Sequence, residues 1–389
     1  MHRGQQRRRS GDDAPWLLWS AMKSRSWMRT VRYARSWKGS TPEVESTQVS
    51  IRRGDLDVPA TLVRPAGVDG RLPCWIAIGG VSRKGRFHPQ LVRFTEALAS
   101  TGVAVLVPGL PEWRRLEVSP RVTLPTIRAS VEYLNERDDV IPDQFGLIGF
   151  SFGAAGVAIA ASHEEVAPQV GGVVLFGGYC CLERTLACML TGSHAWHEDR
   201  HQLHPDPYGR WVVASNYLTQ VPGYEDAGDV ADAVRRLAAE ASGRRVSAWE
   251  PYHDRMISEL RDTICQRRQG IFDILATATT CARPDAAECA NFARELADTC
   301  RRLDPELDPG TSIQRVLVPT QVIHGRGDRL VPFTEGIRLM DQLPADARRG
   351  VTVTSMIDHS KDHVPANPVE HVFEAGKLFR ALHQLVNTV

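Results

Sequence analysis

Residues 145–160, with the sequence FGLIGFSFGAAGVAIA, decide the fold. The apolar run at 145–150 is typical of a short buried strand, and the small residues from Gly153 onward indicate a helix that begins directly after it. Ser151 therefore lies at a sharp turn from strand to helix, which forces its backbone into a strained conformation. Gly149 and Gly153 remove the clashes that side chains would cause beside such a turn. The turn exposes the serine hydroxyl at the carboxyl edge of a sheet, beside a helix N-terminus.

Strands alternate with helices on both sides of this turn. Other apolar runs that indicate strands lie at residues 74–78, 103–107, 172–176, 316–324 and 351–357. Helical patterns separate them at residues 88–100, 121–137, 153–162, 333–343 and 368–386. This alternation predicts an α/β fold with a mostly parallel sheet and helices on both of its faces.

Two β-type runs precede the first buried strand. Residues 44–51 and 57–64 are separated by Arg53-Gly54-Asp55, a sequence typical of a hairpin turn. This hairpin predicts an antiparallel edge on the otherwise parallel sheet.

The alternation stops between Cys181 and about residue 313. This segment offers helical patterns and no persuasive strand, the patterns lying at residues 208–218, 230–241, 258–278 and 286–303. We therefore expect three parts in the chain. They are a basic, Trp- and Arg-rich N-terminal arm (1–40), an α/β core (41–180 and 314–389) and a helical insertion (181–313).

Charge is unevenly distributed along the chain. Residues 1–40 hold ten Lys and Arg against two Asp, a local charge of +8, and the other residues hold 37 basic and 44 acidic side chains, a charge of −7. An acidic body gives no electrostatic reason for nucleic-acid binding, so we expect no nucleic-acid partner.

The arm has the pattern of a basic amphipathic helix. Apolar residues share one stripe and basic residues lie opposite: Trp16, Trp19, Trp27, Val31, Ala34 and Trp37 against Arg25, Arg29 and Arg32. Such a helix can lie on an anionic membrane surface. A helix packed on the domain, or a leader without structure, is the alternative interpretation.

The cysteines and the apolar segments indicate a cytoplasmic protein. The arm is the segment through which it could contact a membrane surface. No Cys-x-x-Cys pair occurs, which argues against a zinc ribbon or a thioredoxin-type site. A disulfide between Cys281 and Cys289 is conceivable, but free thiols are the better interpretation. No segment has the pattern of a transmembrane helix, and the N-terminus makes a poor export signal.

A serine of ordinary pKa is a weak nucleophile, so a base and an orienting acid must accompany Ser151. Asp328 comes just after the strand predicted at 316–324, and His359 comes two residues after the last predicted strand. His363, in the same loop as His359, competes with it for the role of base. His324, before the acid, is expected to support the acid's loop.

With Ser151, Asp328 and His359 in this order at the ends of predicted strands, the sequence resembles the α/β-hydrolase superfamily over about residues 44–389. Residues 181–313 stand where that family carries its cap. The resemblance implies that Ser151 is the nucleophile, Asp328 the orienting acid and His359 the general base.

The resemblance also implies an oxyanion hole built from the backbone N–H groups of Val81 and Phe152. Val81 follows Gly79-Gly80, where many relatives have His-Gly, so this motif is matched only in part.

The resemblance implies an esterase- or lipase-like activity, the cleavage of a carboxylic ester through an acyl-enzyme. The expected substrate is a small-molecule acyl ester, and no cofactor or metal is expected. An acyltransferase, a thioesterase or a peptidase would use the same triad, and a protein of this fold that only binds a ligand is a further alternative. The size of the cap favours a buried apolar pocket, and hence lipid-like or bulky esters.

Two weaker patterns concern possible ligands. His194, His197, His201 and His204 would share one face of a helix, where they could bind a metal or simply form a solvated surface. Arg83, Lys84 and Arg86 follow Val81 and could meet an anionic substrate group, although a solvated loop is the better interpretation.

Overall fold

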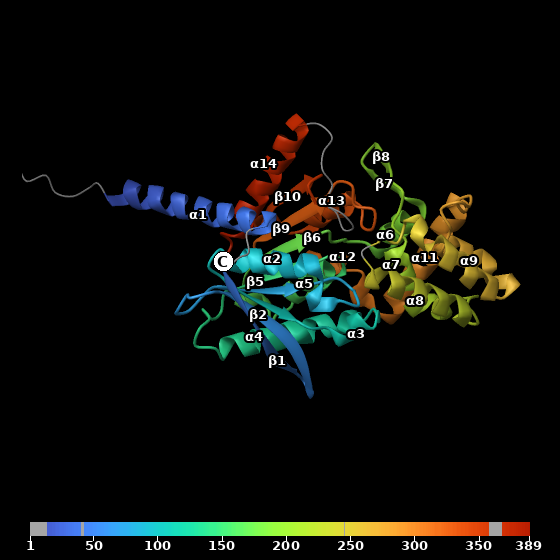
Figure 1. Cartoon of the computed structure of the whole chain (residues 1–389), viewed down its shortest axis with the longest axis horizontal. Coiled ribbons are helices and arrows are strands. Elements are labelled where there is room, and N and C mark those ends of the chain that lie inside the picture. The colour runs from blue at the N-terminus through green and yellow to red at the C-terminus, as the bar shows by residue number, and fades with distance from the viewer. Residues whose placement is uncertain (1–13, 40–42, 245, 358–367) are drawn as a thin grey trace, which may run out of the picture.

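The computed structural model describes residues 14–39, 43–244, 246–357 and 368–389. Within these residues, eight strands form one sheet in the order β1-β2-β4-β3-β5-β6-β9-β10, at the centre of the larger body in Figure 1. The strands are β1 (Val44–Arg53), β2 (Leu56–Pro65), β3 (Cys74–Ile78), β4 (Ala104–Pro108), β5 (Phe145–Phe150), β6 (Val170–Phe176), β9 (Thr320–Gly325) and β10 (Arg348–Thr354). β2 runs antiparallel to both of its neighbours, and the other pairs are parallel. The predicted α/β class with a mostly parallel sheet is confirmed.

The antiparallel edge has the predicted hairpin. β1 and β2 pair in register from Val44–Pro65 to Arg53–Leu56, which leaves a two-residue turn. Gly54 lies in that turn at a φ of 59°, a left-handed conformation that two-residue hairpins require and that glycine adopts without strain.

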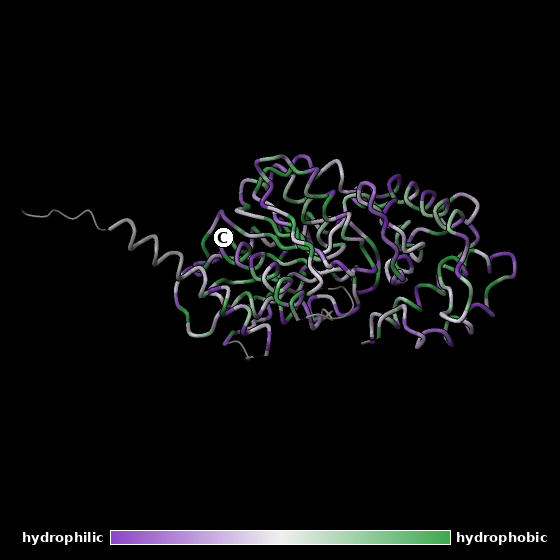
Figure 2. The backbone as a smooth tube through the Cα atoms, turned by 90° about the horizontal axis from the view of Figure 1, so that it is seen from above, coloured by the Kyte–Doolittle hydropathy of each residue, from purple (hydrophilic) through white to green (hydrophobic). Residues whose placement is uncertain are grey.

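Helices cover both faces of the sheet because successive strand residues point to opposite sides. Ile76, Leu106 and Leu147 pack on one helical layer and Trp75, Val105 and Ile148 on the other. The first layer comprises α4 (Thr123–Asn135), α5 (Phe152–Ala161) and α13 (Phe333–Gln342), and the second comprises α1 (Ala14–Lys38), α2 (Pro89–Ala99) and α14 (Pro368–Leu385). In Figure 2 the most hydrophobic stretches run through the middle of this body, where the strands lie.

The segment between β6 and β9 forms a separate group of helices beyond one end of the sheet (Figure 1). Its helices are α6 (Leu182–Thr191), α7 (Tyr208–Tyr217), α8 (Gly228–Gly243), α9 (Asp254–Thr263), α10 (Gln269–Leu275), α11 (Ala286–Leu303) and α12 (Gly310–Ile313). The helices from α6 to α11 bury an apolar cluster of their own, whereas α12 lies against the core, where its Ile313 packs with residues of α5 and α13. A short helix of the core, α3 (Pro111–Arg114), packs close to the same cluster through the following Leu116. We call residues 181–313 the cap.

Two expectations about the cap are wrong. The helix expected at 258–278 is two helices, because Ile264 and Cys265 are extended, with ψ values of 136° and 131°. The cap also contains a β-hairpin, β7 (Ser193–Trp196) and β8 (Asp199–Gln202), where no strand was expected. Each of its strands has only four residues, too few for a clear alternation of apolar and polar side chains.

Two strands of the core begin or end elsewhere than expected. β9 starts at Thr320 and not at residue 316, directly after Pro319, whose nitrogen carries no hydrogen for a ladder bond. β10 ends at Thr354 and not at residue 357. His359 therefore comes five positions after the last strand, and not two after it.

The second half of the arm packs on the domain. Trp27 stacks on the rings of Phe379 and His383 of α14, with ring centroids 5.5 and 4.2 Å apart, and Tyr33 is buried against α2. The side chains of Trp16 and Trp19 lie outside the described part of the arm. No helix within the described ranges is long and apolar enough to span a membrane, and membrane contact by the arm stays a prediction.

Candidate active site

Ser151 stands at the turn between β5 and α5 in a left-handed conformation, with φ 53° and ψ −123°. Its N–H donates to the carbonyl of Phe176 on β6 (2.8 Å), and its own carbonyl accepts from the N–H of Ala154 (2.9 Å). A non-glycine residue held in this region stores strain that the surrounding structure must balance. The strained turn predicted for Ser151 is therefore present.

Two glycines make this turn sterically possible. A Cβ on Gly153 would lie 2.3 Å from the carbonyl oxygen of Gly79, and a Cβ on Gly149 would lie 2.5 Å from the Cα of Ala154. Both contacts involve backbone atoms, which cannot swing aside. Side chains at these positions would push α5 away from β3 and β5 and displace Ser151.

Gly153→Ala should therefore destabilise the protein by about 1–3 kcal/mol, the usual cost of overpacking. The loss would be measured as a lower urea midpoint with an unchanged m-value. Gly376→Ala is the matched control, because among the described residues no atom outside the helix's own backbone lies within 4 Å of the added Cβ in α14, and alanine is the better helix former. Equal midpoints for wild type and Gly153→Ala would contradict the close approach of these segments.

Asp328 lies in the loop after β9 and is 1% exposed. Its Oδ1 accepts hydrogen bonds from the N–H groups of Leu330 and Val331, each at 2.9 Å, which fixes the orientation of the carboxylate. The fully buried His324 places its Nε2 3.4 Å from Oδ2 of Asp328 and 2.9 Å from the carbonyl of Val331. His324 thus supports the acid's loop, the role expected from the sequence.

His359 and His363 belong to residues 358–367, which lie outside the described residues. The choice between them as base stays a prediction.

Val81 and Phe152 lie on either side of Ser151. Phe152 is the first residue of α5, whose N-terminus carries a partial positive charge, and Val81 follows Gly80, at which an added Cβ would lie 3.4 Å from that of Ser151. Among the described residues, neither the N–H of Val81 nor that of Phe152 has a hydrogen-bond acceptor. The assignment of these two N–H groups to an oxyanion hole stays a prediction.

A cavity of about 70 Å³ brings these groups together. Ser151, Val81 and Phe152 line it with Leu330 and Val331 of the acid's loop. The rest of its wall is largely apolar, from the α3–α4 connection and the cap: Val118, Leu182, Thr185, Leu186, Met189, Tyr208, Val212, Val213 and Leu307, with Tyr179 and Gly209. Side chains of the cap thus form much of the wall of the cavity in which Ser151 lies.

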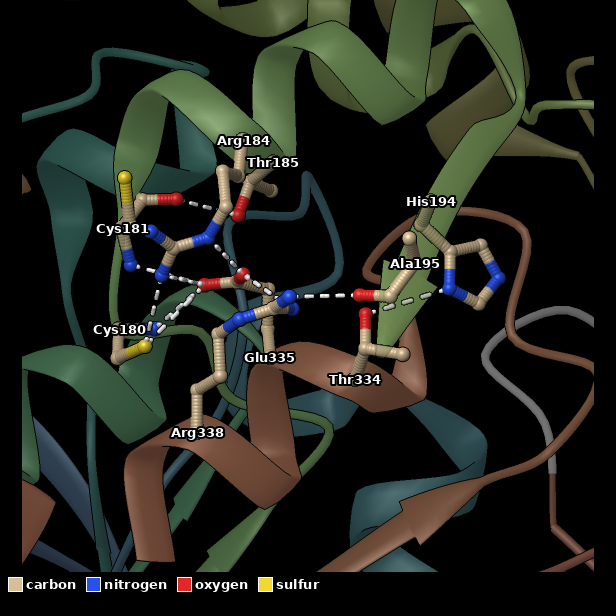
Figure 3. Close-up of polar contacts among 9 residues, drawn as sticks. All are labelled: Cys180, Cys181, Arg184, Thr185, His194, Ala195, Thr334, Glu335 and Arg338. Carbon is tan, nitrogen blue, oxygen red and sulfur yellow. Dashed lines mark hydrogen bonds and ion pairs between the residues drawn. The ribbon is translucent and has the colours of Figure 1, made fainter. Parts of the chain in front are cut away.

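A buried carboxylate ties the cap to the core (Figure 3). Glu335, on α13, has no exposed surface and accepts from the backbone N–H of Cys181 at 2.9 Å and from the guanidinium of Arg184 at 2.7 Å. Arg338, one turn along α13, donates to the carbonyl of Ala195 on β7 at 2.6 Å. The first helix and the hairpin of the cap are therefore both fastened to the helix that follows the acid's loop.

The four histidines of the cap do not share a helix, contrary to the geometry that their spacing suggested. Gly192 ends α6 in a left-handed conformation (φ 74°), and the chain reverses at His197 (φ 51°) into the hairpin. His194 stacks on His201 across the two strands at 4.9 Å, and burial lowers the pKa of His194 to about 4. Within the described ranges, no group of three or more His, Cys, Asp or Glu is placed to hold a metal ion.

Two of the three basic residues after Val81 do not face the cavity, since neither Arg83 nor Arg86 lines it. Arg86 donates to Gln48 and Thr61 of the first hairpin at 3.0 and 3.2 Å, and burial lowers its pKa. Arg83 is exposed. All eight cysteines are free thiols, including Cys281 and Cys289.

Sequence reasoning missed two cap residues that contact the loop carrying Val81, namely Tyr208 and Ser242. The start of a predicted helix at Tyr208 was the only local signal, and nothing along the chain links either residue to a loop more than a hundred positions earlier.

Comparisons by sequence return nothing: no protein-family model matches the chain, and no curated protein does. Solved structures do resemble it. Acylaminoacyl peptidase from Pyrococcus horikoshii aligns over 87% of this chain at 13% identity with a TM-score of 0.44, and this chain spans only 41% of that protein's length. Est1E from Butyrivibrio proteoclasticus aligns over 87% of this chain and 99% of its own at 15% identity, with a TM-score of 0.44. Brefeldin A esterase, a bacterial homologue of human hormone sensitive lipase, aligns over 97% and 84% at 16% identity, with a TM-score of 0.43.

The fold assignment rests on the chain's own architecture. The sheet is mostly parallel with helices on both faces, a strained serine flanked by glycines ends the central strand β5, and a buried carboxylate follows β9. These features together give the chain the α/β-hydrolase fold that its sequence indicated.

Proposed function

We propose that the chain is a serine hydrolase that cleaves a carboxylic ester through an acyl-enzyme on Ser151. One observation carries the proposal: the strained serine lines a largely apolar cavity together with Val81 and Phe152, two residues whose N–H groups have no acceptor among the described residues. Asp328, in the loop that lines the same cavity, supplies the orienting carboxylate. We assign the base to His359 from its place after the last strand, with His363 as the alternative.

In the proposed reaction, the base takes the proton of the Ser151 hydroxyl while the serine oxygen bonds to the ester carbonyl carbon. The N–H groups of Val81 and Phe152 stabilise the negative oxygen of the tetrahedral intermediate. The bond to the alcohol oxygen then breaks, and the base gives its proton to the leaving alcohol. A water molecule, deprotonated by the same base, attacks the acyl-enzyme, which releases the carboxylic acid and restores the serine.

We further propose that the acyl group is short and apolar. The cavity of about 70 Å³ is roughly half the size of a ~150 Å³ apolar cavity that holds benzene, so it suits an acyl group of about two to four carbons. The bulky esters expected from the size of the cap do not suit this volume. The cap helices fill the space over Ser151 with side chains such as Leu186 and Met189.

A series of p-nitrophenyl esters tests this proposal. We expect kcat/KM for the acetyl and butyryl esters to exceed that for the octanoyl ester at least about tenfold, because the longer acyl chain exceeds the volume of the cavity. Leu186→Ala should move the optimum toward longer chains, since it removes part of that wall. Leu237→Ala is the matched control, because Leu237 is equally buried in the same apolar cluster but does not line the cavity.

Either of two results would contradict the proposal. A preference for the octanoyl ester in the wild type would remove the limit on acyl size. Turnover of the matching p-nitroanilides as fast as the esters would favour a peptidase, because an amine is a poorer leaving group than an alcohol and needs a site built to protonate it.

A further inference from the structure

The loop that carries Val81 is held by the cap at two points. The hydroxyl of Tyr208, the first residue of α7, donates to the carbonyl of Val81 at 3.0 Å. The hydroxyl oxygen of Ser242, in the last turn of α8, accepts from the N–H of Arg83 at 2.9 Å. Two helices of the cap therefore fix the backbone of one short loop of the core.

The cap segment that holds this loop also holds the acid's loop. The N–H of Asp206 donates to the carbonyl of Arg329, next to Asp328, at 2.9 Å. The Asp206 side chain accepts from the N–H of Tyr208 at 2.9 Å. The segment from Asp206 to Tyr208 thus bridges the two loops that flank the serine.

The Tyr208 hydroxyl has the chemistry to hold a carbonyl firmly. Burial raises the pKa of Tyr208 to about 12, while the nearby Ser242 hydroxyl acts in the opposite direction. The phenol therefore keeps its proton at any working pH and remains a hydrogen-bond donor. Gly79 and Gly80, just before Val81, offer no side chains that could fix the loop from the core.

We infer that Tyr208 and Ser242 are positioning residues for the oxyanion hole: they fix the loop that presents the Val81 N–H, so that this donor is in place only when the cap is docked. The inference rests on the proposed function. Loss of a whole oxyanion donor lowers kcat by about 10²–10³-fold. Loss of its alignment alone should have a smaller effect, of about tenfold, and should act on kcat and not on KM because the oxyanion exists only in the transition state.

Tyr208→Phe tests this inference, with Tyr217→Phe as the matched control. Tyr217 is a buried tyrosine on the same helix that does not itself line the cavity, and its hydroxyl lies within hydrogen-bond distance of the carbonyl of Val118 (3.0 Å) and of the carboxylate of Asp304 (2.7 Å), away from the loop that carries Val81. Two measurements are made on the full chain: kcat and KM with the acetyl ester, and amide hydrogen exchange of residues 79–87. Tyr208→Phe should lower kcat about tenfold at nearly constant KM and speed exchange in that loop, and Ser242→Ala should do the same more weakly.

The outcomes separate this inference from the proposed function. Unchanged loop exchange in Tyr208→Phe, or a fall in kcat no larger than that of Tyr217→Phe, would overturn the positioning role. If the wild type cleaves no ester, the proposed function fails, and the exchange measurement still decides whether the cap holds the loop.

Discussion

Replacing Ser151 by alanine should lower kcat by about 10⁴–10⁶-fold and leave KM nearly unchanged. Ser151 is the residue to which we assign the acyl-enzyme, while most of the side chains that line the cavity belong to other residues. Alanine removes one oxygen and keeps the turn, so the fold is preserved. The measurement is steady-state hydrolysis of the short-chain ester that the wild type prefers.

Ser162→Ala is the control for this substitution. Ser162 ends the same helix, α5, and its hydroxyl donates only to the carbonyl of Ile159 among the described residues, at 2.7 Å. Loss of this hydroxyl should leave kcat within about twofold of the wild-type value. Residual activity of Ser151→Ala above about 1% would assign the chemistry to another nucleophile.

Asp328→Asn should lower kcat by about 10⁴-fold, the effect of the same change in a well-studied serine protease triad. The asparagine oxygen can still accept from the N–H groups of Leu330 and Val331, so the loop keeps its shape. The neutral amide no longer stabilises an imidazolium and favours the wrong tautomer of the base. A pH profile of kcat would be measured alongside the rate.

Asp139→Asn is the matched control for the loss of a paired carboxylate. Asp139 forms ion pairs with Arg64 and Arg137 and precedes β5, at the edge of the sheet opposite to Ser151. The Asp139→Asn variant should retain the full activity of the wild type. Equal losses for Asp139→Asn and Asp328→Asn would indicate general destabilisation and not an orienting role.

The turn around Ser151 could be predicted because its constraints are local. Gly149 and Gly153 stand within two residues of the serine, and the strand and helix on either side have their own apolar patterns. The hairpin at Gly54 was predictable for the same reason. Alternating strands and helices then give a parallel sheet through general rules of chain connection.

The arrangement of the cap over the site could not be predicted, because it depends on contacts between distant residues. Glu335 meets Arg184, and Tyr208 meets Val81, across more than a hundred positions, and neither pair has a characteristic spacing. The histidine spacing in the cap misled because periods of three and four also occur by chance. A left-handed Gly192 and two four-residue strands place His194, His197 and His201 in a hairpin, and His204 follows it.

The size of the cavity could not be predicted from the sequence either. A long insertion indicates a cap, but only packing shows how much space remains beneath it. Leu186 and Met189 occupy the region over Ser151, and the remaining volume is about 70 Å³.

The most direct test of the central claim, that Ser151 is an activated nucleophile, is labelling of the purified protein with a fluorophosphonate probe, followed by peptide mapping. The wild type would be compared with Ser151→Ala, His359→Ala and His363→Ala. The account predicts one label, on the peptide that contains Ser151, which is lost in Ser151→Ala and His359→Ala and retained in His363→Ala. If the label were lost in His363→Ala and retained in His359→Ala, the role of base would belong to His363. A folded wild-type protein that takes no label, or takes it on another residue, would contradict the account.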